Sequence, residues 1–278
     1  MAAKAIPGIT MIVYLGGGLA NQMFQYAFGR SVSIIRKEEL FFEKTSLGLT
    51  QRAYGLDAFN IKIRFVGLPT TAPRYREGIF HYDPEVYTAP KGTYFLGCWQ
   101  TEKYFNEPII RQELTLRNPV SEQTRRVADE IMATPQSVFI HVRRGDYLHP
   151  VQSAYHGNLG MEYYARAIAY VQERVSNIKF FIFSDDHDWC RQAFPQFRIV
   201  DHIKGQHINL NPNAPGQEHE DLFMMSLCNH AIIPNSSFGW FGAWLGDTQQ
   251  NRIVVGPKRW FLADICSDDI MPDRWTKI

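Results

Sequence analysis

The sequence lacks the charge imbalance, the cysteine pairs and the long apolar runs that identify several classes of protein. Its 29 Lys and Arg residues against 28 Asp and Glu residues give a net charge of +1. The broad basic surface of a dedicated nucleic-acid-binding protein is therefore absent. The four cysteines lie too far apart for a Cys-x-x-Cys metal or redox pair. No stretch approaches the roughly 18 apolar residues that a membrane-spanning helix needs.

Cysteine usage and the N-terminus predict where the protein works. Scattered, unpaired cysteines are typical of a reduced, cytoplasmic protein. Residues 1–10 contain a Pro-Gly and are not followed by a long apolar run, so they do not resemble a signal peptide. Any work at a membrane is expected to be peripheral, at its inner surface. A chain of 278 residues with 45% hydrophobic content is long enough to bury a substantial core.

Short β-branched runs alternate with helical patterns at both ends of the chain. A buried strand is predicted at Ile9–Leu15, a helix from about Asn21 to Arg36, and a strand at Glu39–Glu43. Residues 44–118 predict loops with a few short elements. Beyond them the sequence predicts strands at 137–142, 179–183, 198–200, 231–233 and 252–255, and helices at 121–133, 161–175, 188–194, 218–229 and 238–245. Such alternation indicates parallel βαβ units.

The predicted fold is α/β, with two Rossmann-like α/β domains facing a cleft. The division is expected at residue 119, giving domains 1–119 and 120–278. In parallel sheets of this kind, ligands bind at the carboxyl ends of the strands. The residues that follow each strand are therefore the candidates for chemistry.

The first such segment runs from Gly16 to Gln22 and opens a helix. Glycines let the backbone approach a ligand closely, and a helix N-terminus favours an anion. The segment half-matches the dinucleotide fingerprint, with Asn21 where the third glycine belongs, and no Gly-Lys-Ser/Thr follows as in a P-loop. A tight strand–helix turn is the structural alternative. The amides of Asn21 and Gln22 favour polar recognition.

The second segment, His141-Val142-Arg143-Arg144-Gly145-Asp146-Tyr147, ends a strand. An arginine side chain presents a fork that suits phosphate oxygens. The alternative is a pair of surface ion pairs with Asp146. Because these side chains converge where ligands bind in this architecture, the pattern favours an anion site.

The third segment, Ser184-Asp185-Asp186-His187-Asp188, follows the next strand. Its Asp186-x-Asp188 pattern is typical of metal–diphosphate sites, and carboxylates are ligands for Mg²⁺. Capping and first-turn acids of the next helix are the alternative, favoured for Asp188. Asp185 is left open between these two interpretations.

The fourth segment, Pro234–Trp240, contains Asn235, Ser236, Ser237 and Phe238. Hydroxyl side chains at a helix N-terminus either cap the helix or bind a phosphate. The preceding helix carries Glu218, Glu220 and Asp221. A carboxylate can accept both hydrogens of the guanine N1/N2 edge.

Together these segments closely resemble the inverting α-1,2-fucosyltransferases of bacteria and animals. The resemblance rests on GGGLANQMFQYAFG (16–29), HVRRGDY (141–147), FSDD followed by Trp189, and the run from Asp221 to Leu245. It implies a GT-B fold, GDP-β-L-fucose as donor and no metal requirement or other cofactor. The implied partners are GDP-fucose and a galactose-terminated oligosaccharide, with no nucleic acid.

The resemblance also implies roles for individual residues. Arg143 and Arg144 would hold the donor diphosphate, and Asn21 would reach the donor from the facing domain. The predicted catalytic set is Asn21, Arg143, Arg144 and Asp146. The predicted donor-binding set is Gly17, Gly18, Gln22, His141, Ser184, Asp185, Asp221, Asn235, Ser236, Ser237 and Phe238. The family usually has glycine where this chain has Ala20, which would add strain if that site needs a positive φ.

The expected activity is transfer of L-fucose to the 2-hydroxyl of a terminal galactose. Asp146 and His149 are both candidates to take the acceptor proton. Aromatic residues between Tyr75 and Tyr104 are expected to form an acceptor wall or, alternatively, part of the core. The rival functions are a metal-dependent glycosyltransferase that uses Asp186 and Asp188, and a non-catalytic nucleotide-sugar or glycan-binding module.

Overall fold

The computed structural model describes residues 10–49, 52–78, 80–200, 217–248 and 251–278. Within these ranges the chain forms two compact units. The first contains residues up to Asn118 together with 266–272, and the second contains residues from Pro119 to 265 and 273–278. Segment 266–272 thus belongs to the first unit, although the sequence analysis had placed it in the C-terminal domain.

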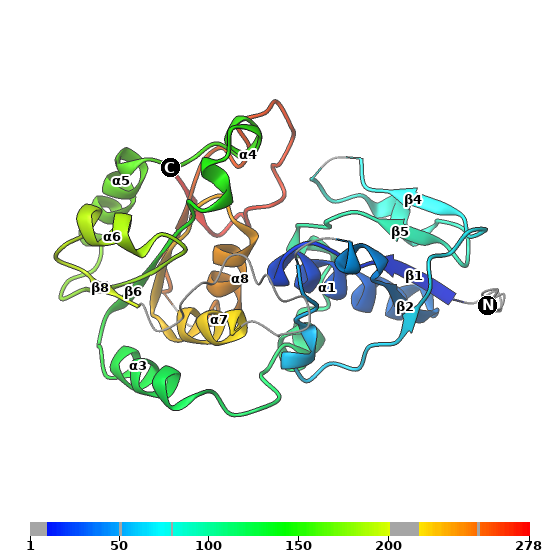
Figure 1. The fold of residues 1–278 in the computed structure, drawn as a ribbon, viewed down its shortest axis with the longest axis horizontal. Helices are drawn as coiled ribbons and strands as arrows, with labels where there is room; N and C mark the ends of the chain where they lie inside the picture. The colour runs from blue at the N-terminus through cyan, green and yellow to red at the C-terminus, as the bar shows by residue number, and fades with distance from the viewer. Residues whose placement is uncertain (1–9, 50–51, 79, 201–216, 249–250) are drawn as a thin grey trace. The chain divides into compact units, whose positions relative to one another are not determined.

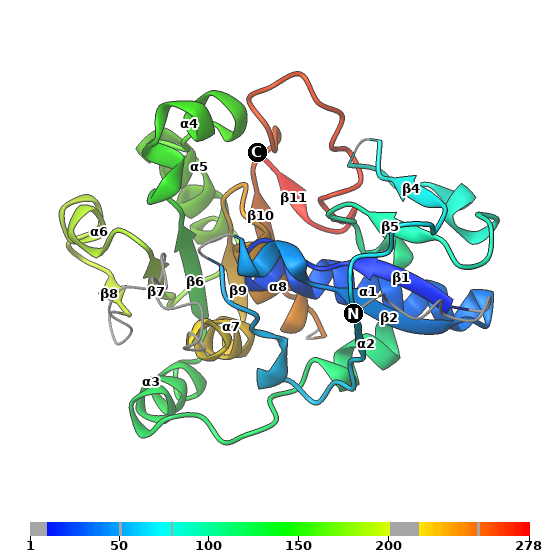
Figure 2. The ribbon, with the colours of Figure 1, turned by 45° about the vertical axis from the view of Figure 1, so that its right-hand side comes forward.

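The first unit contains a parallel sheet with the strand order β3-β2-β1-β5-β4. Its strands are β1 (Thr10–Tyr14), β2 (Glu39–Glu43), β3 (Phe65–Val66), β4 (Arg74–Arg76) and β5 (Tyr94–Leu96). Helix α1 (Leu19–Arg36) joins β1 to β2 and runs beside both strands (Figure 2). The shorter helices are α2 (Glu107–Glu113), η1 (Thr45–Gly48), η2 (Leu56–Ala58), η3 (Pro84–Tyr87) and η4 (Glu102–Tyr104).

Aromatic side chains of the 75–104 region fill the core of the first unit. Tyr94, Phe95 and Trp99 are buried. The Trp99 ring stacks on Phe28 of α1, with ring centroids 4.0 Å apart. Of the two alternatives for these three side chains, the structure supports the core, because rings with no exposed face cannot pack against a sugar.

The second unit contains a parallel sheet with the order β11-β10-β9-β6-β7-β8. Its strands are β6 (Ser137–Val142), β7 (Lys179–Ser184), β8 (Arg198–Ile199), β9 (His230–Ile232), β10 (Val254–Gly256) and β11 (Thr276–Lys277). Its helices are α3 (Glu122–Met132), η5 (Asp146–Leu148), α4 (Pro150–His156), α5 (Met161–Gln172), α6 (His187–Ala193), α7 (Glu218–Leu227) and α8 (Ser237–Leu245). The predicted α/β class with parallel sheets is confirmed.

Helices cover both faces of the second sheet. Figure 1 shows α5 and α6 on one side of the strands and α7 and α8 on the other. On the first side, apolar residues of α5 and α6 pack with the β6 side chains Val138, Ile140 and Val142. All six residues of β6 are buried, as expected for a central strand of a parallel sheet covered on both faces. The loop that follows β6 therefore starts from a rigid support.

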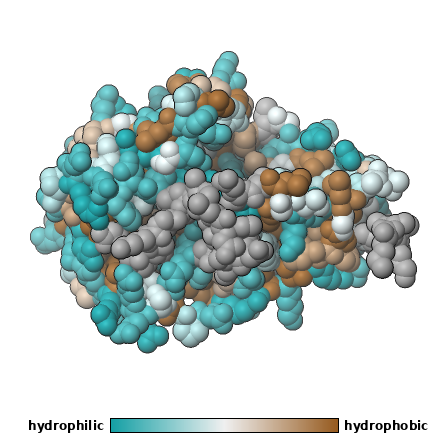
Figure 3. Space-filling model, viewed as in Figure 1, coloured by the Kyte–Doolittle hydropathy of each residue, from teal (hydrophilic) through white to brown (hydrophobic). Residues whose placement is uncertain are grey.

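The described residues contain no candidate for a membrane-spanning helix. No helix among them is both long enough and apolar enough to cross a bilayer. Exposed apolar residues occur in both units, for example Leu49, Leu68, Val151 and Leu262. On the face drawn in Figure 3 such side chains lie in small groups among hydrophilic ones.

Candidate active site

The carboxyl ends of three neighbouring strands bring three of the predicted segments together. Strand β6 pairs in parallel with β7 on one side and with β9 on the other. Arg143 to Asp146 follow β6, Asp185 and Asp186 follow β7, and Asn235 to Ser237 follow β9. Because the strands are parallel, all three turns lie at the same edge of the sheet.

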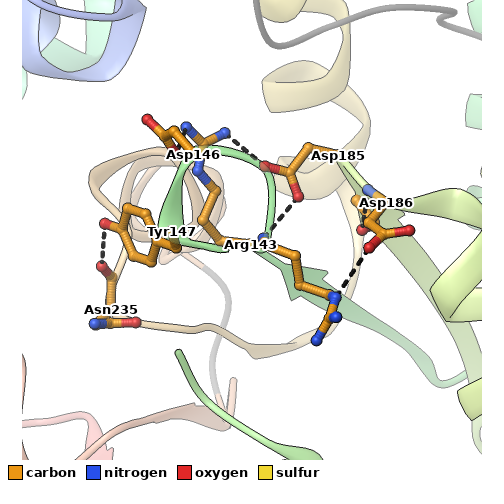
Figure 4. A network of polar contacts seen from close by, with 8 residues as sticks. Arg143, Asp146, Tyr147, Asp185, Asp186 and Asn235 are labelled. Carbon is orange, nitrogen blue, oxygen red and sulfur yellow. Dashed lines mark hydrogen bonds and ion pairs between the residues drawn. The ribbon is translucent and has the colours of Figure 1, made fainter. Parts of the chain in front are cut away.

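Arg143 is held between two carboxylates at this edge (Figure 4). Its guanidinium nitrogens lie 2.6 Å from Oδ1 of Asp146 and 2.9 Å from Oδ2 of Asp185. The guanidinium carbon also lies 5.6 Å from the centroid of the Tyr147 ring. These contacts restrict the side chain before any ligand arrives, and 14% of it remains exposed. A restrained, partly exposed guanidinium is suited to bind a phosphate.

Arg144 points away from this pair into different surroundings. Its Nε atom donates to Oδ2 of Asp186 at 3.0 Å, and its guanidinium carbon lies 4.2 Å from the centroid of the Trp189 ring. Both partners belong to the start of α6. Arg144 is therefore anchored to that helix, and the two arginines are not equivalent.

Asp185 shapes the loop that carries both arginines. Its side chain is fully buried, and Oδ1 accepts the backbone N–H of Arg144 at 2.8 Å. A Cβ atom on Gly145 would lie 2.5 Å from Oδ2 of Asp185, closer than atoms can approach. Position 145 must therefore be glycine for this carboxylate to occupy its place. Asp185, which the sequence left open, is a structural support of the arginine loop.

The Asp186-x-Asp188 pattern does not form a converging pair of metal ligands. Asp186 caps α6, where Oδ1 accepts the backbone N–H of Trp189 at 3.0 Å, and Oδ2 binds Arg144. Asp188 is exposed and pairs with Arg191 at 2.7 Å. Among the described residues, no three His, Cys, Asp or Glu side chains are grouped to hold a metal ion. The geometry thus supports the capping interpretation of this segment.

The turn after β9 combines a structural clamp with a helix N-terminus. Nδ2 of Asn235 donates to the carbonyl oxygens of His156 and Trp260, at 2.7 and 3.0 Å. The hydroxyl of Tyr147 donates to the carbonyl of Asn235 at 3.0 Å (Figure 4). The amide nitrogen of Asn235 is thus used within the protein and is not available to a ligand.

Ser236 and Ser237 stand where α8 begins. Ser236 is the N-cap residue of α8, yet its side chain makes no capping hydrogen bond. The first N–H groups of the helix and a partly exposed Ser237 are therefore positioned for an anion. Phe238 lies next to the buried His141 of β6, with ring centroids 5.5 Å apart.

Two further predicted donor contacts are buried in the second unit. Ser184 ends β7, and its Oγ accepts the backbone N–H of Asp186 at 2.9 Å. Asp221 lies in the first turn of α7 and is 3% exposed. Its neighbour Glu220 accepts hydrogen bonds from Ser121 and Thr124 at the start of α3. Glu220 is therefore a structural anchor. Glu218 and Asp221 are the other acids of this turn, and Asp221 is the buried one of the two.

The glycine turn of the first unit follows β1. Gly17 has a φ of 77° and closely faces the side-chain amide of Asn21, so glycine is required there. Gly18 is the N-cap residue of α1 and provides no side-chain cap. Ala20 lies within α1 and is not among the residues with positive φ. The strain expected for Ala20 is therefore absent, because the left-handed residue of this turn is Gly17.

The side chain of Gln22 stabilises this turn through hydrogen bonds to the backbone. It is fully buried, and Nε2 donates to the carbonyl oxygens of Gly17 and Ala53, at 2.9 and 2.8 Å. Its Oε1 accepts the N–H of Gly55 at 3.1 Å. Every polar atom of its side chain is engaged, so the expectation that Gln22 contacts a ligand is withdrawn.

Asn21, in contrast, is partly exposed and has a side-chain partner that the sequence analysis missed. Its Oδ1 accepts a hydrogen bond from Nε2 of Gln100 at 2.9 Å. No motif marked Gln100, because the contact joins residues 79 positions apart.

Of the two candidate bases, His149 is an exposed residue at the start of α4, and Asp146 is the partner of Arg143.

Comparison with known proteins agrees with this arrangement of motifs. The model of the family described as "Glycosyl transferase family 11" matches residues 6–278. An α-1,2-colitosyltransferase of Escherichia coli is 31% identical over 96% of this chain and 98% of its own length. The O-antigen biosynthesis glycosyltransferase WbnK of Escherichia coli is 27% identical over 95% of this chain and 99% of its own length. A galactoside α-(1,2)-fucosyltransferase 1 of Ateles belzebuth is 28% identical over 86% of this chain and 66% of its own length.

Solved structures share the fold at low sequence identity. The fucosyltransferase NodZ from Bradyrhizobium superposes with a TM-score of 0.53, over 85% of this chain and 93% of that chain, at 14% identity. This likeness confirms the GT-B-like fold expected from the sequence. With a family model that spans residues 6–278 and a relative 31% identical over nearly its full length, the chain belongs to glycosyl transferase family 11.

Proposed function

We propose that this glycosyltransferase transfers L-fucose from GDP-β-L-fucose to the 2-hydroxyl of a terminal galactose in a glycan. The observation that carries the proposal is the placement of Arg143. Two carboxylates hold its guanidinium at the carboxyl edge of the second sheet, the same edge at which α8 begins without a side-chain cap. The relatives named as colitosyl- and fucosyltransferases support a deoxysugar as the transferred group.

The proposed reaction is a direct displacement at the anomeric carbon of the donor. The acceptor O2 forms a bond to that carbon from the face opposite GDP, while the bond to the β-phosphate oxygen breaks. Negative charge then develops on the leaving diphosphate. Arg143 and the N–H groups at the start of α8 would stabilise this charge without a metal ion. The acceptor proton passes to a base, for which we propose Asp146, the carboxylate that contacts Arg143, in preference to His149.

For the base of the nucleotide we propose a contact with Asp221. A buried carboxylate accepts both hydrogens of the guanine N1/N2 edge, and adenine offers no such pair. Asp221→Ala is expected to weaken GDP binding by roughly ten- to a hundredfold, the effect of about 1–3 kcal/mol. The ratio of the GDP affinity to the ADP affinity should fall by the same factor. Calorimetric titration of both nucleotides measures this ratio, and an unchanged ratio would assign Asp221 a structural role.

A second candidate function differs from the first only in the donor substrate. Because an α-1,2-colitosyltransferase is 31% identical over 96% of this chain, a colitose-bearing nucleotide is the main rival substrate. Colitose lacks the 3-hydroxyl of fucose. Competition between the two donors in one assay would rank them by kcat/KM.

Turnover in the presence of a chelator tests the proposal. Wild-type protein with GDP-fucose and either lactose or N-acetyllactosamine should release GDP and form an α-1,2-linked product in excess EDTA. The linkage is read by NMR of the product. Activity that disappears with EDTA and returns with Mn²⁺ would favour the metal-dependent rival. Nucleotide-sugar binding without turnover of any galactoside would favour the binding module.

A further inference from the structure

The turn that follows β5 holds a bulky residue in a left-handed backbone conformation. Trp99 has a φ of 57°, which costs a non-glycine residue on the order of 1–3 kcal/mol. Two sets of contacts enforce it. The buried Trp99 ring stacks on Phe28. The carboxylate of Glu77 accepts the backbone N–H groups of Cys98 and Trp99, at 2.6 and 3.1 Å. Strain of this kind persists only where the surroundings impose it, and it gathers at functional sites.

Glu77 is built into this turn. It directly follows β4, and two consecutive backbone N–H groups form a cradle for its carboxylate. Burial raises the pKa of Glu77. The two backbone N–H groups favour the charged carboxylate and oppose this effect, but burial is the larger of the two. A Cβ atom on Gly97 would lie 2.6 Å from the Cβ of Glu77, so only glycine fits at that position. The carboxylate therefore holds the turn in the shape that Trp99 requires.

This shape carries Gln100 to Asn21. Strand β5 pairs with β1, so the turns after the two strands are neighbours. Nε2 of Gln100, a residue only 8% exposed, donates to Oδ1 of Asn21 at 2.9 Å. With Oδ1 engaged, the Nδ2 group is the part of the Asn21 amide that remains for a ligand. Asn21 is itself partly exposed, as a ligand contact requires.

We propose that Gln100 is a positioning residue that fixes the side-chain amide of Asn21 with its N–H donors toward the substrate. A carboxamide that is free to rotate presents either its oxygen or its nitrogen. The phosphate and ring oxygens of a sugar nucleotide can only accept hydrogen bonds, so the nitrogen end of the amide is the end that can bind them. The inference rests on the proposed function, together with the contact between Asn21 and the donor that the family resemblance implies. Gln100 and the Glu77 turn determine which end of Asn21 is offered.

A double-mutant cycle tests this inference. Gln100→Met keeps the length and the apolar contacts of the side chain but cannot donate a hydrogen bond. We expect kcat to fall roughly ten- to a hundredfold, as for a misplaced contact in an active site, with little change in Tm. If Gln100 acts through Asn21, the double variant is no slower than Asn21→Ala alone. Losses that multiply, or a Gln100→Met variant with the wild-type kcat, would overturn the inference.

Gln25 provides the matched control. It joins the same two turns, accepting the N–H of Gly16 and donating to the carbonyl of Gly97, at 2.9 and 3.1 Å. Like Gln100 it is buried, with 1% exposed against 8%, but it bonds backbone atoms. Gln25→Met should lower Tm. In a double variant with Asn21→Ala, the fold-losses in kcat of the two single variants should multiply. A non-additive result for Gln25 as well would show that the cycle reports only general loosening of the turns.

The proposed function and this inference can fail separately. The wild-type rate with GDP-fucose decides the first, and the cycle is run with whichever donor and acceptor the wild type uses. A second readout needs no turnover. The side-chain amide NMR signals of Asn21, assigned by their loss in Asn21→Ala, should shift or broaden in Gln100→Met. Unchanged signals would contradict the positioning role.

Discussion

Arg143→Ala should reduce kcat/KM for GDP-fucose by about 10²–10³ while the protein stays folded, because one charge-stabilising contact to a leaving group contributes that much. The guanidinium of Arg143 is restrained by Asp146 and Asp185 and is still partly exposed. Steady-state kinetics with GDP-fucose and a galactoside measure the loss. Circular dichroism and Tm show whether the fold is kept.

Arg144→Ala is the matched control for this prediction. The adjacent arginine pairs with Asp186 and stacks on Trp189, so it is anchored to α6. Removing its side chain should lower kcat/KM by about tenfold or less, since a partly exposed ion pair contributes up to about 1 kcal/mol. Equal losses for the two variants would show that the loop acts as one unit. A near-wild-type rate for Arg143→Ala would refute the phosphate assignment.

Asp185→Ala is expected to lower the free energy of unfolding by about 3–5 kcal/mol, the usual cost of removing one partner from a buried ion pair. Asp185 is fully buried, binds Arg143 and accepts the backbone N–H of Arg144. The protein that remains folded should also show a lower rate of sugar transfer, because the loop that carries the arginines loses its support. Denaturant unfolding and kinetics measure the two effects.

Asp188→Ala, three residues along the same segment, serves as the comparison. Asp188 pairs with Arg191 at the surface, where a pair contributes about 0–1 kcal/mol. Its replacement should leave both stability and transfer nearly unchanged. If Asp185→Ala and Asp188→Ala had the same small effect, the support role of Asp185 would be wrong.

Strands β6 and β7 of the second unit were predictable because each contains a run of apolar residues. Strand β11, which reads Thr-Lys, was not predicted. The strand predicted at 137–142 is β6, with identical bounds, and the one predicted at 179–183 is β7, one residue longer. Strands β4 and β5 were not predicted. Each has only three residues: β4 reads Arg-Tyr-Arg and has no hydrophobic pattern, and β5 reads Tyr-Phe-Leu, a run too short to show a period. They exist because they pair with distant segments, and such pairing leaves no local signal.

The site was predictable where function depends on residue type, and less so where it depends on contacts between distant residues. The paired arginines stood out as a motif, but their different partners appear only when β7 lies beside β6. Gln22 and Asn235 were expected to contact a ligand, whereas their amides bind the protein backbone. A carboxamide has the same appearance in a sequence in either role. Gln100 was missed for the same reason.

Calorimetric titration of GDP and GMP in excess EDTA tests the central claim most directly, namely that the loop after β6 binds a diphosphate through Arg143. The wild type should bind GDP much more tightly than GMP, because only GDP carries the β-phosphate. In Arg143→Ala this preference should largely disappear while GMP binding is retained. A wild type that binds the two nucleotides equally, or an Arg143→Ala variant that keeps the full preference for GDP, would contradict the account.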